Sequence, residues 1–404
     1  MAQAVAPRTP VAGDWNLPGL AAIALGHGVN DLFSGTVALT IFFVVSSAGL
    51  APWYQGALGF LWYVTSSIVQ PFFGAYSDRH GRWWFMPTGI LLVVLALSFA
   101  SLTTSIPMLA LLIVVGGFGS AIMHPEAGKY AAMLSGSRKS SGISIFQIGG
   151  SLGFAVGPLA MAALLAHFGR NASIVLLVPG LIACAYLYVA IHRADGLARG
   201  AHAQRPPVPA ATAGPVDTFG VGLVVASTSL RFLASMAFVT YLPNVLIAHG
   251  GTIVQAGQIV SAFLTIGIVG MYAGGTLGDR FGSVTVSVAS LILAVPCLFG
   301  FFLLPAPLSI ASLLLGSVFL AVQNAPGVVI VQAMLPKNLG MALGLMNGVA
   351  FGAGSALVAV VGIAVARIGP EAALMQISAA PLLAAASYLI IARRLPATIL
   401  RSRA

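Results

Sequence analysis

The sequence predicts an all-α membrane protein with twelve transmembrane helices, arranged as two six-helix repeats around a central cavity. Three observations support this fold class: composition, an internal duplication and the number of long apolar runs. Hydrophobic residues make up 59% of the 404 positions and charged residues only 6%, whereas a soluble domain has roughly a quarter charged residues. The composition therefore excludes a water-soluble globule.

The duplication appears as a motif that recurs half a chain later. Residues 74–82 read GAYSDRHGR and residues 275–282 read GTLGDRFG, an offset of 201 positions. The same offset relates Pro125 to Pro326, the triplet 132–134 to 333–335, and Gly153 to Gly354. Four landmarks at one spacing indicate an internal repeat. Duplicated halves made of membrane helices are typical of secondary transporters, whose binding site lies at the repeat interface.

Long apolar runs supply the individual helices, because a span needs about 20 mainly apolar residues. The first run is far longer than a signal-peptide core and contains Asn30 and Asp31, so we expect a retained helix. The predicted spans are approximately 17–47, 52–77, 85–104, 107–134, 140–168, 171–192, 218–248, 252–278, 285–304, 307–335, 339–366 and 371–392. This division predicts an N-terminal bundle at 1–192, a cytoplasmic linker at 193–217 and a C-terminal bundle at 218–404. The linker is rich in Ala, Pro, Gly and Arg and lacks apolar periodicity, as a flexible tether would.

Basic residues predict the orientation. If the N-terminus is cytoplasmic, 14 of the 18 Lys and Arg residues fall in cytoplasmic segments, and the outside loops hold only Arg170 and Arg367. Cytoplasmic loops carry the excess of Lys and Arg in membrane proteins. We therefore expect both termini in the cytoplasm.

The duplicated loop motif predicts a conformational latch on the cytoplasmic face. Glycine at its first position allows two helices to approach closely, and the aspartate can pair with a nearby arginine or with a helix terminus. The predicted latch residues are Gly74, Asp78, Arg79, Gly81, Arg82, Gly275, Asp279 and Arg280. The second copy has Ser283 in place of the last arginine, so we expect a weaker latch there. The alternative is that these charges only determine topology.

This loop resembles the signature loop of the major facilitator superfamily. Three further stretches are similar to its fosmidomycin-resistance family of bacterial drug exporters: 26–31 (GHGVND), 124–126 (HPE) and 144–150 (SIFQIGG), the last continuing to Gly157-Pro158. The resemblance covers most of the first half, and the second half resembles only the superfamily. It implies a location in the bacterial inner membrane. Two departures are a missing arginine in the fourth span and Ala162 where antiporters usually have glycine.

Two charges inside the spans are candidate functional groups, because an ionisable side chain at the centre of a span is costly. Asp31 lies near the middle of the first span and Arg231 near the middle of the seventh, where the repeat offset relates Arg231 to Asn30. In the superfamily these two spans flank the cavity, so the resemblance implies that the two charges face each other. Arg231 could then hold an anionic substrate while Asp31 exchanges a proton. The alternative is a permanent ion pair that only locks helix packing.

Other polar residues within spans are secondary candidates. Glu126 and Lys129 are one turn apart and could form a structural salt bridge, but Pro125 disturbs that helix and makes Glu126 and His124 candidates for a proton path. His27 precedes Asp31 by one turn and could join that path or satisfy a neighbouring carbonyl. Four buried amides could line the cavity or join helices: Gln147, Gln323, Asn324 and Asn347.

The predicted function is secondary active transport by alternating access, most simply a proton-coupled exporter of the fosmidomycin-resistance type. The alternative is a transporter of an endogenous organic anion, such as a carboxylate, a phosphonate or a metallophore. We expect a monomer in the lipid bilayer whose partners are a small-molecule substrate and protons. No nucleotide-binding loop, catalytic triad or metal-ligand pattern is present in the sequence, and no basic groove is interleaved with aromatics. We therefore predict no enzyme activity, no cofactor, no metal and no nucleic-acid partner.

Overall fold

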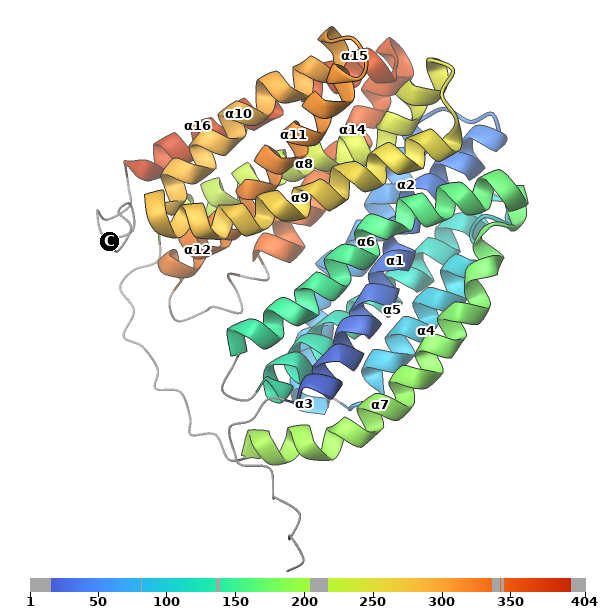
Figure 1. The fold of residues 1–404 in the computed structure, drawn as a ribbon, viewed down its shortest axis with the longest axis vertical. Helices are drawn as coiled ribbons and strands as arrows, with labels where there is room; N and C mark the ends of the chain where they lie inside the picture. The colour runs from blue at the N-terminus through green and yellow to red at the C-terminus, as the bar shows by residue number, and fades with distance from the viewer. Residues whose placement is uncertain are drawn as a thin grey trace, which may run out of the picture.

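A computed structural model describes residues 16–80, 82–135, 139–203, 217–335, 342 and 345–393, and this part of the chain is helical throughout, without strands. Ten of its helices are long and apolar enough to cross a membrane. The chain is therefore an all-α, multi-pass membrane protein, as predicted. Figure 1 shows the helices of the first half of the chain lying together on one side and those of the second half on the other.

Among the described residues, the first half contains seven α-helices, one π-helical segment and two 3₁₀ turns. These are α1 (Leu17–Ser47), α2 (Trp53–Tyr63), the π-helical η1 (Val64–Ile68), α3 (Gln70–His80), α4 (Phe85–Ser98), α5 (Ile106–Leu134), α6 (Lys139–Phe168), the 3₁₀ turns η2 (Gly169–Asn171) and η3 (Ser173–Leu176), and α7 (Leu177–Ala203). The predicted span 52–77 is divided by η1 into two helices of eleven residues each. The predicted span 85–104 is helical only to Ser98. Neither is among the ten long apolar helices.

The second half follows the predicted spans closely. Its described helices are α8 (Thr218–Ala248), α9 (Ile253–Phe281), α10 (Ser283–Leu303), α11 (Leu308–Val322), α12 (Asn324–Met334), the π-helical η4 (Leu345–Val349), α14 (Ala350–Ile368), α15 (Pro370–Ile377) and α16 (Ala380–Ala392). The first helices of the two halves begin alike. Asn16 caps α1 by accepting a hydrogen bond from the Gly19 amide, and Asp217, 201 positions later, caps α8 through the Gly220 amide.

The end of the first bundle differs from the prediction. Helix α7 continues to Ala203, so the predicted boundary at residue 192 falls inside a helix. Residues 193–203 include four alanines and Leu197, which favour the helical conformation, and these outweigh the two glycines in the segment. Of the predicted linker 193–217, residues 204–216 lie outside the part of the chain that the structure describes.

Helices α1 and α6 pack backbone against backbone. A Cβ atom added at Gly153 would overlap the carbonyl oxygen of Gly28, and one added at Gly157 would overlap the backbone of Gly35. Small residues allow this close approach between membrane helices. The glycines of the predicted Gly153-x-x-x-Gly157 pattern therefore fix α6 against α1, the helix that carries Asp31.

The two halves contact each other at one end of the molecule. There α6 lies beside α9, where the Ser261 hydroxyl donates to the Ala155 carbonyl, and α2 lies beside α14, where Gly56 meets the backbone of Ala359. These contacts involve the middle of α6 and of α14 and the N-terminal parts of α9 and α2. The halves diverge toward the opposite end, which carries α3 and α12 (Figure 1).

Candidate functional site

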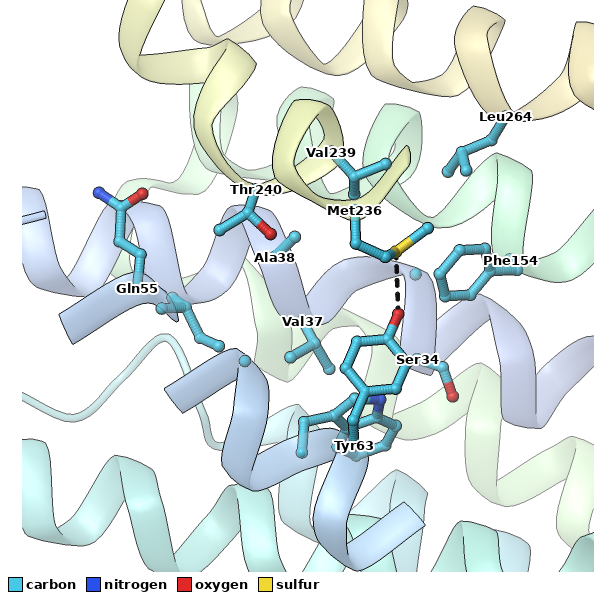
Figure 2. A pocket seen from close by; sticks show the side chains of 14 residues that line it. Ser34, Val37, Ala38, Gln55, Tyr63, Phe154, Met236, Val239, Thr240 and Leu264 are labelled. Carbon is cyan, nitrogen blue, oxygen red and sulfur yellow. Dashed lines mark hydrogen bonds between the residues drawn. The ribbon is translucent and has the colours of Figure 1, made fainter. Parts of the chain in front are cut away.

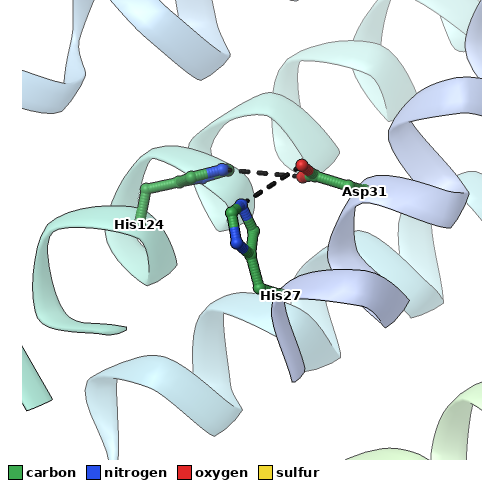
Figure 3. A group of neighbouring side chains, drawn as sticks. All are labelled: His27, Asp31 and His124. Atoms are coloured by element: carbon green, nitrogen blue, oxygen red, sulfur yellow. Dashed lines mark ion pairs between the residues drawn. The ribbon is translucent and has the colours of Figure 1, made fainter. Parts of the chain in front are cut away.

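A cluster of three ionisable side chains lies inside the first half. Figure 3 shows His27 and Asp31 on α1 and His124 on α5 pointing toward one another. His27 Nε2 lies 3.2 Å from Asp31 Oδ2, and His124 Nε2 lies 3.5 Å from Asp31 Oδ1. Asn30 Nδ2 donates to Asp31 Oδ1 at 2.8 Å. The predicted grouping of His27 with Asp31 on one face of the helix is confirmed, and the structure adds His124 to it.

Local packing holds the two imidazole rings in place. The ring of His27 is buried, stacks on the ring of Phe146 of α6 and occupies the space next to Gly150, where a Cβ would overlap it. Its Nδ1 lies 2.8 Å from the Phe146 carbonyl oxygen. His124 Nδ1 lies 2.9 Å from the carbonyl oxygen of Ser120, one turn earlier on α5. Each ring is therefore anchored by a backbone carbonyl on one side and faces Asp31 on the other.

The cluster is partly accessible. The side chain of Asp31 is 18% exposed and that of His124 is 24% exposed, whereas that of His27 is 5% exposed. Asn30 is fully buried; its amide also donates to the Ser120 hydroxyl at 3.1 Å, and its Oδ1 has no hydrogen-bond partner. His124 and Asp31 are thus the members of the cluster that a solvent proton could reach first.

A second polar group lies in the other half, around Arg231 of α8. Arg231 is only 4% exposed and its Nε has no hydrogen-bond partner. Gln323, at the junction of α11 and α12, donates from Nε2 to Tyr388 of α16 at 2.5 Å and to Thr228 of α8 at 3.3 Å. The Tyr388 hydroxyl is close enough to Arg231 to interact with it electrostatically, and Gln323 Oε1 has no partner. The group therefore combines a buried cation with an unpaired donor and an unpaired acceptor.

Asp31 and Arg231 are not paired in this conformation. Among the residues that the structure describes, the ion-pair partners of Asp31 are His27 and His124, and Arg231 has no carboxylate partner. The sequence led us to expect that the two charges face each other across the cavity, with a permanent ion pair as the alternative. The histidines instead satisfy Asp31 within its own half, which leaves the Arg231 cation separate.

Glu126 forms a different contact from the cluster at Asp31. Lys129 Nζ lies 3.2 Å from Glu126 Oε2, so the predicted salt bridge one turn apart is present. The Ser77 hydroxyl of α3 donates to Glu126 Oε2, and Lys129 Nζ donates to the Ser77 hydroxyl at 2.7 Å and to its carbonyl at 3.0 Å. This network, in which Glu126 and Ser77 are buried and Lys129 is partly exposed, connects α5 to the last turns of α3. Glu126 therefore faces α3 although it is two residues from His124.

The latch motif lies at the C-termini of α3 and α9. A Cβ on Gly74 would come within 3.7 Å of the Pro125 side chain, and one on Gly275 would come within 3.9 Å of Ala325, so the two copies pack against corresponding helices. Arg82 and Arg280 are exposed, and the Arg280 guanidinium lies 5.1 Å from the ring of Phe281. The side chains of Asp78, Arg79 and Asp279, and the whole of Gly81, lie outside the described residues. Their ion pairing therefore stays a prediction.

The remaining amide candidates are scattered. Gln147 of α6 is exposed and Asn324 at the start of α12 is half-buried, and neither belongs to the two polar groups above. The side chain of Asn347 lies outside the described residues. The sequence analysis missed Ser120, Thr228 and Tyr388. Thr228 could have been found, because the repeat offset relates it to His27. Tyr388 carries no comparable signal.

A small cavity lies between the two halves, near their contact. It has a volume of about 40 Å³ and is lined mainly by apolar side chains from α1, α2, α6, α8 and α9. Figure 2 shows the Tyr63 hydroxyl of α2 directed at Met236 of α8, which it contacts at 3.1 Å. The space suits one or two water molecules. The two halves therefore pack tightly around this cavity, with space for little more than water between them.

The charged cluster can also be compared with metal sites. His27, Asp31 and His124 each offer one ligand atom, and these atoms lie within 4.8 Å of one another. The sequence analysis did not expect this grouping, because the three residues are separated by up to 97 positions. The contact of His27 with Asp31, at 3.2 Å, is at the upper end of the hydrogen-bond range, and that of His124 with Asp31, at 3.5 Å, is an ion-pair distance.

Apolar spanning helices with ionisable groups buried among them define a multi-pass membrane transporter. The chain belongs to the Major Facilitator Superfamily, whose profile matches residues 23–309 and 224–403. It is 28% identical over 354 residues to the fosmidomycin resistance protein of Escherichia coli K12, covering 85% of each chain. It is 27% identical over 383 residues to YfnC of Bacillus subtilis 168, an uncharacterised transporter of the same type, covering 92% of each chain. The resemblance found in the sequence is thus confirmed.

Solved structures of low sequence identity share the fold. A bacterial homologue of the human lysosomal transporter Spinster, in an inward-facing and occupied conformation, has a TM-score of 0.71 at 15% identity and covers 95% of this chain and 98% of its own. A point mutant of the nucleoside transporter NupG also has a TM-score of 0.71 at 15% identity, with coverage of 93% and 100%. At this identity the likeness concerns the fold alone.

Proposed function

We propose that this protein is a secondary active exporter that works by alternating access and couples the outward movement of small anionic compounds to the inward movement of protons. The observation that carries the proposal is the separation of charges between the halves. Asp31 and two histidines lie in the first half, and a buried, unpaired Arg231 lies in the second. The similarity to a fosmidomycin resistance protein supports drug export, including export of phosphonate-type antibiotics.

The proposal includes twelve spans in two repeats with both termini in the cytoplasm. The broken helix α2–η1–α3 and the short helix α4 would supply the two spans beyond the ten long helices. The matching caps of α1 and α8 support the repeat. Cysteines placed in the linker 193–217 should resist impermeant thiol reagents in intact cells, whereas cysteines near Gly49 or Gly251 should react. Labelling of the linker from outside would contradict the orientation.

Arg231 is proposed to bind the anionic group of the substrate. A buried guanidinium without a carboxylate partner has an unfavourable environment that a substrate anion would relieve through charge-assisted hydrogen bonds. Gln323, Asn324 and Asn347 are proposed to contribute to the same wall of the cavity, and Gln147 to the opposite wall. Substrate binding and proton binding then act on different halves, so each ligand can favour a different arrangement of the two.

Asp31 is proposed to hold the coupled protons at its carboxylate, which they share with His27 and His124, while Asn30 donates a hydrogen bond to it. In the conformation described, the halves meet at the end that the proposed topology places outside, and they diverge toward the cytoplasmic end. Protons would leave the cluster at Asp31 in this conformation and substrate would enter from the cytoplasm. The Glu126–Lys129–Ser77 network would hold α3, which carries the first latch motif, against α5 within the first half. The latch motifs would stabilise one arrangement of the two halves and must open for the other.

Drug susceptibility of a sensitised bacterial strain expressing this chain tests the proposal, measured across a panel that includes fosmidomycin. Expression should raise the inhibitory concentration of anionic compounds. Arg231→Ala should abolish that increase, while Arg367→Ala, which removes an exposed arginine, should preserve it. The double variant Asp31→Asn with Arg231→Gln should remain inactive, because substrate and proton sites are both lost. Restored activity in the double variant would reduce the two charges to a structural role.

The alternative function is transport of an endogenous organic anion, such as a carboxylate, a phosphonate or a metallophore. The unpaired Arg231 favours any of these equally. A panel in which no drug changes potency, combined with uptake or release of a metabolic anion by purified protein in liposomes, would favour this alternative.

A further inference from the structure

The hydrogen-bond donors at the Asp31 cluster can be counted from the contacts of its two histidines. A backbone carbonyl oxygen only accepts hydrogen bonds. His27 Nδ1 lies 2.8 Å from the Phe146 carbonyl oxygen, and His124 Nδ1 lies 2.9 Å from the Ser120 carbonyl oxygen. Both Nδ1 atoms must therefore carry hydrogen, and in a neutral ring each Nε2 would present a lone pair.

Those two Nε2 atoms face opposite oxygens of one carboxylate. His27 Nε2 is 3.2 Å from Asp31 Oδ2 and His124 Nε2 is 3.5 Å from Asp31 Oδ1. A lone pair facing a carboxylate oxygen is repulsive unless a proton lies between them. Each of the two contacts consequently needs its own proton, so neutral rings with an ionised Asp31 do not fit this geometry.

The surroundings also limit how many protons the cluster can hold. Asp31 Oδ1 already accepts a hydrogen bond from Asn30 Nδ2 at 2.8 Å, and the opposite orientation of that amide would place its oxygen against the carboxylate. A third added proton would have to sit on Asp31 facing an imidazolium N–H. Such a proton would replace an attractive contact by a repulsive one.

Other ionisable groups around the cluster do not supply these protons. On α5, Glu126 and Lys129 pair with each other and with Ser77 of α3. Tyr63 of α2 lies close enough to interact electrostatically with Asp31, and its hydroxyl hydrogen is directed at Met236. Arg231 of α8 makes no ion pair with Asp31, and the described part of α6 offers only the Phe146 carbonyl and ring here.

We propose that His27, Asp31 and His124 form a two-proton site, in which one carboxylate bridges two imidazolium rings. His27 is the enclosed member, locked between Phe146 and Gly150, and His124 is the accessible member. Protons enter and leave through His124, and the second proton follows from His27 across the carboxylate. The inference deepens the proposed proton coupling, and its consequence for transport rests on that function: two protons enter for each substrate exported.

The protonation state can be measured without knowing the substrate. The chain has seven histidines, so replacing His80, His167, His192, His202 and His249 by Gln leaves only the two of interest. Nitrogen NMR of imidazole-labelled protein in lipid nanodiscs distinguishes imidazolium from both neutral tautomers. At pH 7.5 a histidine in water is mostly neutral, because its pKa is about 6.5. Both rings should nevertheless be imidazolium.

The matched variants assign the cause. Asp31→Asn should render both rings neutral at pH 7.5, whereas Asp217→Asn, which changes a distant cap of α8, should leave both charged. A neutral ring at His27 or His124 in the protein that retains Asp31 would overturn the two-proton site. This measurement does not need the Asp31→Asn variant, so it remains decisive if that variant fails to fold. A stoichiometric divalent metal in the purified protein, lost in Asp31→Asn, would also overturn it. If both rings are charged but the wild-type protein does not transport, the two-proton site stands and only the proposed function is contradicted.

Discussion

The separation of Asp31 from Arg231 can be tested by comparing two double-mutant cycles. In the first, Asp31→Asn and His27→Gln are made singly and together; in the second, Asp31→Asn is combined with Arg231→Gln. His27 and Asp31 are in contact at 3.2 Å and His27 is buried. Hydrogen bonds to charged groups contribute about 1.5–3 kcal/mol, so we expect a coupling energy in that range for the first cycle. Arg231 has no ion pair with Asp31 and is not among the groups that act on it. Sites without shared partners are additive within about 0.3–0.5 kcal/mol, which is the value we expect for the second cycle.

The assay is unfolding by sodium dodecyl sulfate in mixed micelles, followed by tryptophan fluorescence. Trp62 is buried in the first half, so its fluorescence reports the unfolding of that half. Coupling above about 1 kcal/mol between Asp31 and Arg231 would show that the two charges interact in the resting protein. That result would refute the assignment of Arg231 as a free cation available to substrate. Absence of coupling between Asp31 and His27 would refute the cluster itself.

Two further predictions concern the latch and the contact between α1 and α6. Asp78→Asn should leave the protein inserted in the membrane but reduce transport in liposomes. Asp279→Asn should reduce transport less, because the second motif lacks the final arginine. Equal transport rates for Asp78→Asn and the wild type would show that the motif only determines topology. Gly153→Ala should lower the unfolding free energy by about 1–3 kcal/mol, because its Cβ would overlap the Gly28 carbonyl. Gly222→Ala is the control, since a Cβ there meets open space, and equal stability of the two variants would contradict the close packing.

The all-helical membrane fold was predictable from the composition and from the recurring apolar runs, because both reflect what a bilayer requires of a chain that crosses it. Apolar runs of sufficient length must become helices in a bilayer, where each backbone polar group needs an internal partner. The first predicted span ends at the observed residues, Leu17 and Ser47. The π-helical break inside 52–77 was not anticipated, although Pro71 lacks the N–H that would donate to the Ser67 carbonyl and so favours a distortion of the turn at Val64–Ile68.

The candidate site was predictable only in part. A charge in a membrane span is conspicuous in any sequence, so Asp31 and Arg231 could be found directly. Their partners depend on which helices meet. His124 is 93 positions from Asp31 and reaches it only because α1 and α5 are neighbours, and Tyr388 reaches Arg231 from the last helix. The repeat offset relates the matching caps of α1 and α8, but it gave no information on which side chains pair.

Proton-driven transport in proteoliposomes tests the central proposal most directly. Liposomes containing the purified protein are given an imposed pH gradient, and accumulation of radiolabelled fosmidomycin is followed alongside substrate exchange without a gradient. The wild type should concentrate the compound against its gradient when the pH gradient is present. Asp31→Asn should retain exchange and lose the concentrating activity, because Arg231 still binds the anion but no proton is coupled to it. Accumulation that ignores the pH gradient, or an Asp31→Asn variant that concentrates as the wild type does, would contradict the account.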